Sequence, residues 1–232
     1  MTTDQTIWDF FLSKLENPFG VAGLMGNLYV ESHLNPMLLQ SSYARKLGMT
    51  SAEYTQATDN GSYANFVRDG AGYGLVQWTF WSRKQALLDF AKTLECSIGN
   101  LNMQLNYLWT ELQKYTTVIN TLKSAKSVRE ASDIVALRYE KPSDTSEKAL
   151  QNRANFGLQY YEKYAGDPPM REVIITTDKV NIRLGNSKKY GRLGQVNKNA
   201  IFEWVATAEN GWHAIVFNKQ VAWVSGEFST VK

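Results

Sequence analysis

The chain has 232 residues, of which 44% are hydrophobic, and a formal net charge of only +3. This length and hydrophobic content suffice for one large domain or two unequal domains, each with its own core. So small a charge does not suit a protein that neutralises many phosphates, so nucleic acid is not an expected partner. The positive excess lies in residues 167–232, which carry 9 basic and 6 acidic side chains. This fits a tail drawn to an anionic surface, and ordinary scatter of surface lysines explains it equally well.

Cysteine and histidine are scarce. Cys96 is the only cysteine, and the only histidines are His33 and His213, so we expect no internal disulfide, no metal and no other cofactor. The first residues lack the cationic start and apolar run of a signal peptide, and no window approaches the ~18 apolar residues of a membrane span. The sequence therefore predicts a protein that is made in a cytoplasm and does not insert into a membrane.

Residues 3–166 carry apolar side chains at helical spacing, which predicts a mainly α-helical domain. Residues 127–130, Ser-Val-Arg-Glu, form a capping-box pattern, which predicts a helix that ends near Tyr139 because Pro142 stops it. A last helix is predicted from about residue 144 to 164.

Residues 43–79 interrupt this helical pattern. The segment contains Asp59-Asn60-Gly61, Asp69-Gly70, Gly72 and Gly74, a density of turn residues that helices do not tolerate. It predicts loops with a small β-hairpin. A helical domain with such an insertion can form a cleft between the two parts.

After Gly166-Asp167-Pro168-Pro169 the hydrophobic period changes from helical to alternating. We expect domains at residues 1–166 and 173–232, joined by a linker at residues 167–172. The second domain should be a small all-β barrel because about 60 residues carry closely spaced short strands. The expected strands are Val173–Thr177, Val180–Arg183, Ile201–Ala206, Trp212–Phe217 and Val221–Val224. The fold class is therefore α+β.

Glu31 is the first candidate for catalysis. It follows an apolar, glycine-bearing helix and precedes Pro36, which prevents the helix from continuing. The negative end of the helix dipole and partial burial both disfavour an ionised carboxylate there. A carboxyl group kept protonated in this way is what a glycosidase needs to protonate its leaving oxygen. A solvated glutamate at a helix end is the plainer alternative.

Residues 72–83 place an amide and two indoles just after the insertion, beside the expected cleft. Sugar rings stack on aromatic faces, so Trp78 and Trp81 are candidate sugar contacts, as is the amide of Gln77. The alternative for both tryptophans is core packing. A second carboxylate would come from Asp59, Asp69 or Glu140, among which the sequence does not decide.

Three segments in this order resemble the phage tail lysozyme family, over about residues 5–165. They are Glu31-Ser32, Gly74-Leu75-Val76-Gln77-Trp78-Thr79, and Tyr139-Glu140-Lys141-Pro142. The pattern is also similar to that of goose-type lysozymes and lytic transglycosylases. It departs from transglycosylases at Val76, where they carry methionine, and at Trp78.

This resemblance implies a lysozyme-like fold and an N-acetylmuramidase, which cleaves the β-1,4 bond between N-acetylmuramic acid and N-acetylglucosamine. Glu31 would be the general acid. Gln77, Tyr139 and Glu140 would line the cleft and contact the glycan. From their places in and just after the insertion, we also expect Asp69 and Trp78 to contact the glycan.

The tail resembles a bacterial Src-homology-3-like domain, through Val180-Asn181-Ile182-Arg183, the segment from Gly211 to Val216, and the segment from Val221 to Ser225. Such domains in lysins bind peptidoglycan, which implies a wall anchor. The aromatic residues of this part divide between core packing and ligand contact: Tyr190, Trp204, Trp212 and Trp223.

Together these features favour a bacteriolytic, antimicrobial phage endolysin, monomeric and held in the host cytoplasm until lysis. A lytic transglycosylase, or a non-catalytic wall-binding virion protein, is the alternative. A wall peptidase that uses Cys96 is disfavoured because a small buried thiol explains that residue more simply.

Overall fold

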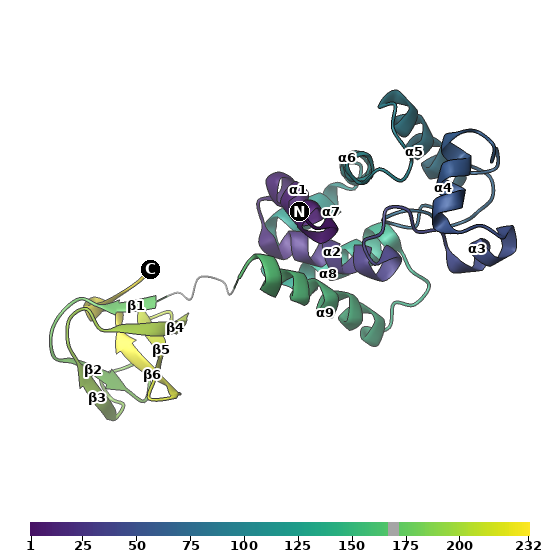
Figure 1. The fold of residues 1–232 in the computed structure, drawn as a ribbon. Helices are drawn as coiled ribbons and strands as arrows, with labels where there is room; N and C mark the ends of the chain where they lie inside the picture. The colour runs from purple at the N-terminus through teal and green to yellow at the C-terminus, as the bar shows by residue number, and fades with distance from the viewer. Residues whose placement is uncertain (167–171) are drawn as a thin grey trace. The chain divides into compact units, whose positions relative to one another are not determined.

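A computed structural model describes residues 1–166 and 172–232, which form two compact units, Met1–Ala165 and Gly166–Lys232 (Figure 1). We call them the helical unit and the β unit. The predicted linker, residues 167–172, lies outside the described residues except for Glu172, where the first strand begins. Each unit has its own hydrophobic core. Each therefore has the means to fold by itself.

The helical unit contains nine α-helices within residues 1–166, and none of its helices is long and apolar enough to cross a membrane. The predicted α+β class and the mainly helical first part are confirmed. The helices are α1 (Thr3–Leu15), α2 (Pro18–Ser32), α3 (Ser41–Leu47), α4 (Ser51–Asp59), α5 (Trp81–Thr93), α6 (Leu101–Leu112), α7 (Thr116–Ser124), α8 (Val128–Val135) and α9 (Glu147–Tyr164), with a π-helix (Ala136–Glu140) directly after α8.

Helix α2 lies at the centre of this unit, packed against α1, α7, α8 and α9 (Figure 1). Asn17 caps its first turn by accepting a hydrogen bond from the backbone N–H of Phe19, and Pro18 opens the helix. His33 ends it in the left-handed conformation, with φ of 52°. Glu31 therefore lies in the last turn of a buried helix, as predicted.

Two glycines allow this close packing. A Cβ atom at Gly23 would lie 2.5 Å from the Cβ of Ala131 on α8, and one at Gly26 would lie 2.3 Å from the carbonyl oxygen of Arg153 on α9. Neither space admits a side chain. The two glycines therefore let α8 and α9 pack directly against the helix that carries Glu31.

The helix predicted after Ser127 is confirmed, and its end is a π-helix. The Ser127 hydroxyl accepts from the backbone N–H of Glu130, whereas the Glu130 carboxylate accepts from Lys126 rather than closing the capping box on Ser127. The backbone N–H of Lys141 reaches the carbonyl of Ala136 at 2.8 Å, the five-residue spacing of a π-turn. Such turns occur frequently at functional sites.

The insertion differs from its prediction. Helices α3 and α4 occupy much of its first part, and the expected β-hairpin is reduced to isolated antiparallel bridges at Tyr73, with Leu39 and with Trp78. Thr50 and Glu53 form a complete capping box that starts α4. This capping box is a local helix signal, but it lies in a segment rich in turn residues. The glycine pattern, taken alone, therefore predicted loops.

Within residues 172–232 the β unit is a seven-stranded antiparallel sheet in the order β3-β2-β6-β5-β4-β1-β7. The five predicted strands are present, and β3 and β7 are additional. The polar, glycine-bearing sequence of β3 and the three-residue length of β7 explain why the pattern missed them. The strands are β1 (Glu172–Ile175), β2 (Val180–Arg183), β3 (Arg192–Val196), β4 (Ile201–Thr207), β5 (Trp212–Phe217), β6 (Gln220–Ser225) and β7 (Ser229–Val231), with a short 3-10 helix (Gly226–Phe228) before β7.

Candidate active site

A cleft of about 460 Å³ in the helical unit brings together three of the residues predicted for the site: Glu31, Gln77 and Glu140. Its walls come from the end of α2, the residue before α3, the loop before α5, the start of α5 and the end of the π-helix. The full lining is Glu31, Gln40, Gly72, Val76, Gln77, Thr79, Phe80, Arg83 and Glu140. Two carboxyl groups and one guanidinium therefore face one space. We call it the cleft.

Glu31 is held by an ion pair with Arg153 of α9. The distance from Arg153 Nη2 to Glu31 Oε1 is 2.8 Å, and the two side chains are 7% and 22% exposed, respectively. Arg153 Nη1 also donates to the amide oxygen of Asn27 at 3.1 Å. The sequence predicts partial burial and the negative end of a helix dipole around Glu31, and the structure adds a positive charge from a partner 122 residues away in the chain.

Glu140 lies in different surroundings. Its Oε1 atom is buried and has no hydrogen-bond partner among the described residues. Burial, followed by the negative charge of Glu31, raises the pKa of Glu140 to about 8, against the opposing effect of Arg83 and Arg153. These surroundings favour the protonated form of Glu140.

A buried network behind the cleft fixes Arg83. Glu111 of α6 accepts from Arg83 Nε at 2.7 Å and Nη2 at 2.8 Å, and from the Tyr139 hydroxyl at 2.6 Å and Trp78 Nε1 at 3.0 Å. Although burial opposes ionisation of Glu111, the bonds from Arg83, Tyr139 and Trp78 keep its pKa below the ordinary value. In the sequence, the signal for this network is Glu111, a charged residue on the apolar face of α6.

Trp78 and Tyr139 belong to this network and not to the cleft surface. Trp78 is fully buried and Tyr139 is 3% exposed, so neither has a free face for a sugar ring. The structure contradicts the glycan contacts predicted for Trp78 and Tyr139. For Trp78 it shows the alternative, core packing. Both residues support the wall of the cleft from behind through Glu111.

Exposed aromatic side chains lie next to the cleft instead. Phe80, which lines it, and Trp81 are 61% and 60% exposed, with ring centroids 6.1 Å apart. Gln77 lines the cleft with a positive φ of 48°, and its amide nitrogen donates to the carbonyls of Leu38 and Gly74. The available stacking faces are therefore those of Phe80 and Trp81.

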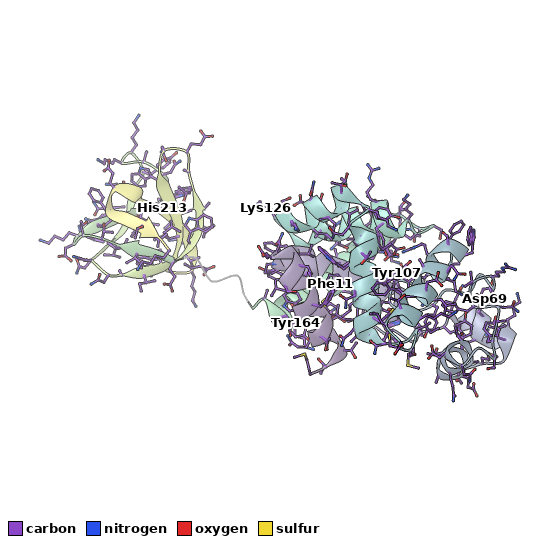
Figure 2. All side chains as sticks on the ribbon, turned by 90° about the horizontal axis from the view of Figure 1, so that it is seen from above. Phe11, Asp69, Tyr107, Lys126, Tyr164 and His213 are labelled. Carbon is purple, nitrogen blue, oxygen red and sulfur yellow. The ribbon has the colours of Figure 1, made fainter. Side chains whose placement is uncertain are left out.

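Asp69 lies elsewhere. It forms a buried ion pair with Lys84, 2.6 Å from Nζ to Oδ1, and accepts hydrogen bonds from the hydroxyls of Tyr54 and Tyr63. Figure 2 shows it at the end of the helical unit that is remote from Tyr164. Its predicted glycan contact is therefore incompatible with this placement, because its oxygens are occupied within the core.

Asp59 also lies outside the cleft. Its carboxylate accepts from the backbone N–H of Ile98, and it lines a hollow together with Lys92 and Cys96. Of the three candidates for a second carboxylate, Glu140 alone shares the cleft with Glu31. Across residues 1–166 and 172–232, no group of three or more His, Cys, Asp or Glu side chains is placed to hold a metal ion.

We expect Asp69→Asn to destabilise the helical unit by about 3–5 kcal/mol, because it leaves the Lys84 ammonium buried without its counter-charge. Cleavage by the molecules that remain folded should be unchanged. Chemical denaturation and activity per folded molecule measure the two effects. Glu147→Gln, which breaks an exposed ion pair with Arg129, is the matched control and should leave unfolding nearly unchanged. A stable Asp69→Asn protein that has lost activity would return Asp69 to the functional site.

Comparison with known proteins identifies the helical unit. A family model described as phage tail lysozyme matches residues 2–164. The matched range contains every residue of the cleft. A search of curated proteins gives no significant match to the chain.

Proposed function

The chain belongs to the phage tail lysozyme family, and on this basis we propose that it is an N-acetylmuramidase that hydrolyses bacterial peptidoglycan. Membership of the family indicates a lysozyme-like action on peptidoglycan. The finer proposal is cleavage of the β-1,4 bond between N-acetylmuramic acid and N-acetylglucosamine, without a metal or other cofactor.

One observation carries this proposal: the cleft holds two carboxyl groups in opposite surroundings. Glu31 is paired with Arg153, and Glu140 has a buried oxygen without a hydrogen-bond partner in the described part of the chain. Hydrolysis of a glycosidic bond needs one carboxyl group that holds a proton and one that is ionised. Pairs of acids whose surroundings separate them in this way mark acid and base roles.

The exposed rings of Phe80 and Trp81 support a glycan as the substrate, because they give sugar rings apolar faces at the edge of the cleft. The second carboxyl group favours hydrolysis over the transglycosylase alternative, since Glu31 and Glu140 together can serve water as the acceptor.

For the β unit we propose wall binding. Its sheet is compatible with the resemblance to a bacterial Src-homology-3-like domain, and it carries a groove of about 270 Å³. The groove mixes charged and aromatic side chains, which suits a short peptide or polymer of the wall. The lining includes Asp178, Lys179, Arg183, Lys188, Trp212 and Phe228. A monomeric phage endolysin, held in the host cytoplasm until lysis, is the setting that we propose.

The direct test is release of new reducing ends from purified bacterial sacculi by the full chain. Glu162→Gln changes an exposed carboxylate on α9 and is the matched control for variants of the cleft. We expect wild type and control to release reducing ends at equal rates. Sacculi that remain uncut at every pH tested would contradict the proposed activity.

A further inference from the structure

We propose that Arg83 is a specificity-determining residue of the cleft, which binds the lactyl group of N-acetylmuramic acid through the carbonyl oxygen of that group, and that Glu111 is its positioning residue. The lactyl group is the substituent that N-acetylmuramic acid carries and N-acetylglucosamine lacks. The inference rests on the proposed action on bacterial glycan and deepens it by naming the part of the substrate that is recognised.

The first step is the fixed position of Arg83. Its Nε donates to Glu111 Oε1 at 2.7 Å and its Nη2 donates to Glu111 Oε2 at 2.8 Å, a two-point pairing that sets orientation as well as distance. Nη2 also donates to the Tyr139 hydroxyl at 2.8 Å, and the guanidinium carbon lies 5.2 Å from the centre of the Tyr139 ring. Arg83 is therefore held from behind by buried groups of the cleft wall.

The second step is the nitrogen that remains. Nη1 of Arg83 forms no hydrogen bond with any residue that the structure describes, and it is not one of the buried atoms that lack a partner. It is therefore open to solvent, in a side chain that is 27% exposed and lines the cleft. A guanidinium nitrogen of this kind carries two N–H donors. Because Glu111 fixes the other two nitrogens, these donors have a fixed place in the cleft.

The third step is the sugar face beside this donor. Phe80 directly precedes α5, and its carbonyl accepts from the backbone N–H of Arg83 at 3.0 Å, so both side chains leave the same turn. Both line the cleft, and the ring of Phe80 is exposed. A sugar ring that stacks on Phe80 therefore carries its substituents on the side of the cleft where the guanidinium lies.

The fourth step is the chemistry of those substituents. A guanidinium binds oxygen acceptors, and a carboxylate most strongly. The two sugars of the glycan share hydroxyl and N-acetyl groups and differ in the lactyl group. Its carbonyl oxygen belongs to an amide where a wall peptide is attached and to a carboxylate where none is. Of the described residues that line the cleft, Arg83 alone is cationic, so it is the partner that fits this oxygen.

The test measures kcat/KM of the full chain on three soluble substrates with one glycan backbone. The first keeps its peptides. The second has lost them to an amidase, which leaves free lactyl carboxylates. In the third, carbodiimide activation and borohydride reduction have converted these carboxylates to alcohols. We expect wild type to have a kcat/KM about 10–100-fold lower on the third substrate than on the second, mainly through a higher KM, because a charge-assisted hydrogen bond is lost.

Arg83→Lys tests the residue. The ammonium group still neutralises Glu111, but it lacks the planar fork that pairs with Glu111 at two points and leaves a further nitrogen for the cleft. We expect the preference for carboxylate over alcohol nearly to disappear. Both rates scale with the same amount of folded protein, so their ratio does not depend on how well the variant folds. Arg129→Lys, on exposed ion pairs of α8, is the matched control and should keep the wild-type ratio.

Glu111 is tested by the same ratio. Glu111→Gln keeps one acceptor oxygen and loses the two-point pairing, so the guanidinium is no longer held in one orientation. The preference for carboxylate should fall toward that of Arg83→Lys, and Glu162→Gln should keep it. An unchanged ratio in Glu111→Gln would show that Glu111 supports the fold and does not position Arg83.

The remaining outcomes separate this inference from the proposed function. If wild type cuts the carboxylate and alcohol substrates equally, or if Arg83→Lys keeps the wild-type preference, Arg83 does not bind the lactyl group, while the glycosidase proposal stands. If wild type cuts the peptide-bearing strands and neither peptide-free substrate, the recognised oxygen belongs to the peptide, which also overturns the inference. If sacculi release no reducing ends, the proposed function fails and the inference fails with it.

Discussion

Replacing Glu31 by glutamine is expected to lower peptidoglycan cleavage about 10²–10⁴-fold and to leave the fold intact. The amide keeps the shape of the side chain and can still accept a hydrogen bond from Arg153, but it carries no negative charge and no acidic proton. The loss is expected whichever carboxyl group holds the proton. The rate of reducing-end release from sacculi measures the loss of activity, and thermal unfolding shows whether the fold is intact.

The control for this variant is Glu162→Gln, which should keep full activity because it lies outside the cleft. Binding of the Glu31→Gln protein to walls should also be unchanged. Retention of more than about a tenth of the wild-type rate would show that Glu31 is not part of the reaction, since a general acid or a general base contributes more than that.

Separating the chain after Gly166 is expected to separate its activities. Each unit has its own core, so fragments 1–166 and 167–232 should both fold. Fragment 1–166 should cleave soluble peptidoglycan at the rate of the full chain but lose about 10²-fold or more on intact cells, because tethering raises the local concentration at the wall. Fragment 167–232 should bind walls and hydrolyse nothing.

Sedimentation of a fluorescent fusion of residues 167–232 with purified walls tests the binding part. Lys188→Ala, in the groove of the β unit, should weaken binding, and Lys198→Ala, exposed and outside the groove, is its matched control. If the fusion stays in solution with walls that the full chain binds, the β unit is not the anchor, and the helical unit must hold the wall.

Local patterns predicted much of the fold. The apolar run before Glu31 and the proline after it predicted where α2 ends, and the motif at Ser127 predicted where α8 begins. The alternation of apolar and polar residues predicted five of the strands of the β unit. These features depend on neighbours within a few residues, which periodicity and capping describe.

The candidate site was predicted only in part because its chemistry depends on distant partners. The pairing of Glu31 with Arg153 spans 122 residues, and that of Arg83 with Glu111 spans 28. No local pattern distinguishes Trp78, which is buried, from Trp81, which is exposed three residues later. The tertiary structure decides which aromatic faces and which charges meet the cleft.

Mass spectrometry of peptidoglycan digested by the full chain, after borohydride reduction, identifies the bond that is cut. We expect fragments that end in reduced N-acetylmuramic acid and that are missing from a Glu31→Gln digest. Ends on N-acetylglucosamine would show that the other bond is cut, and 1,6-anhydro ends would show a transglycosylase. Intact glycan strands with cut peptides would contradict the proposal that the cleft is a glycosidase site.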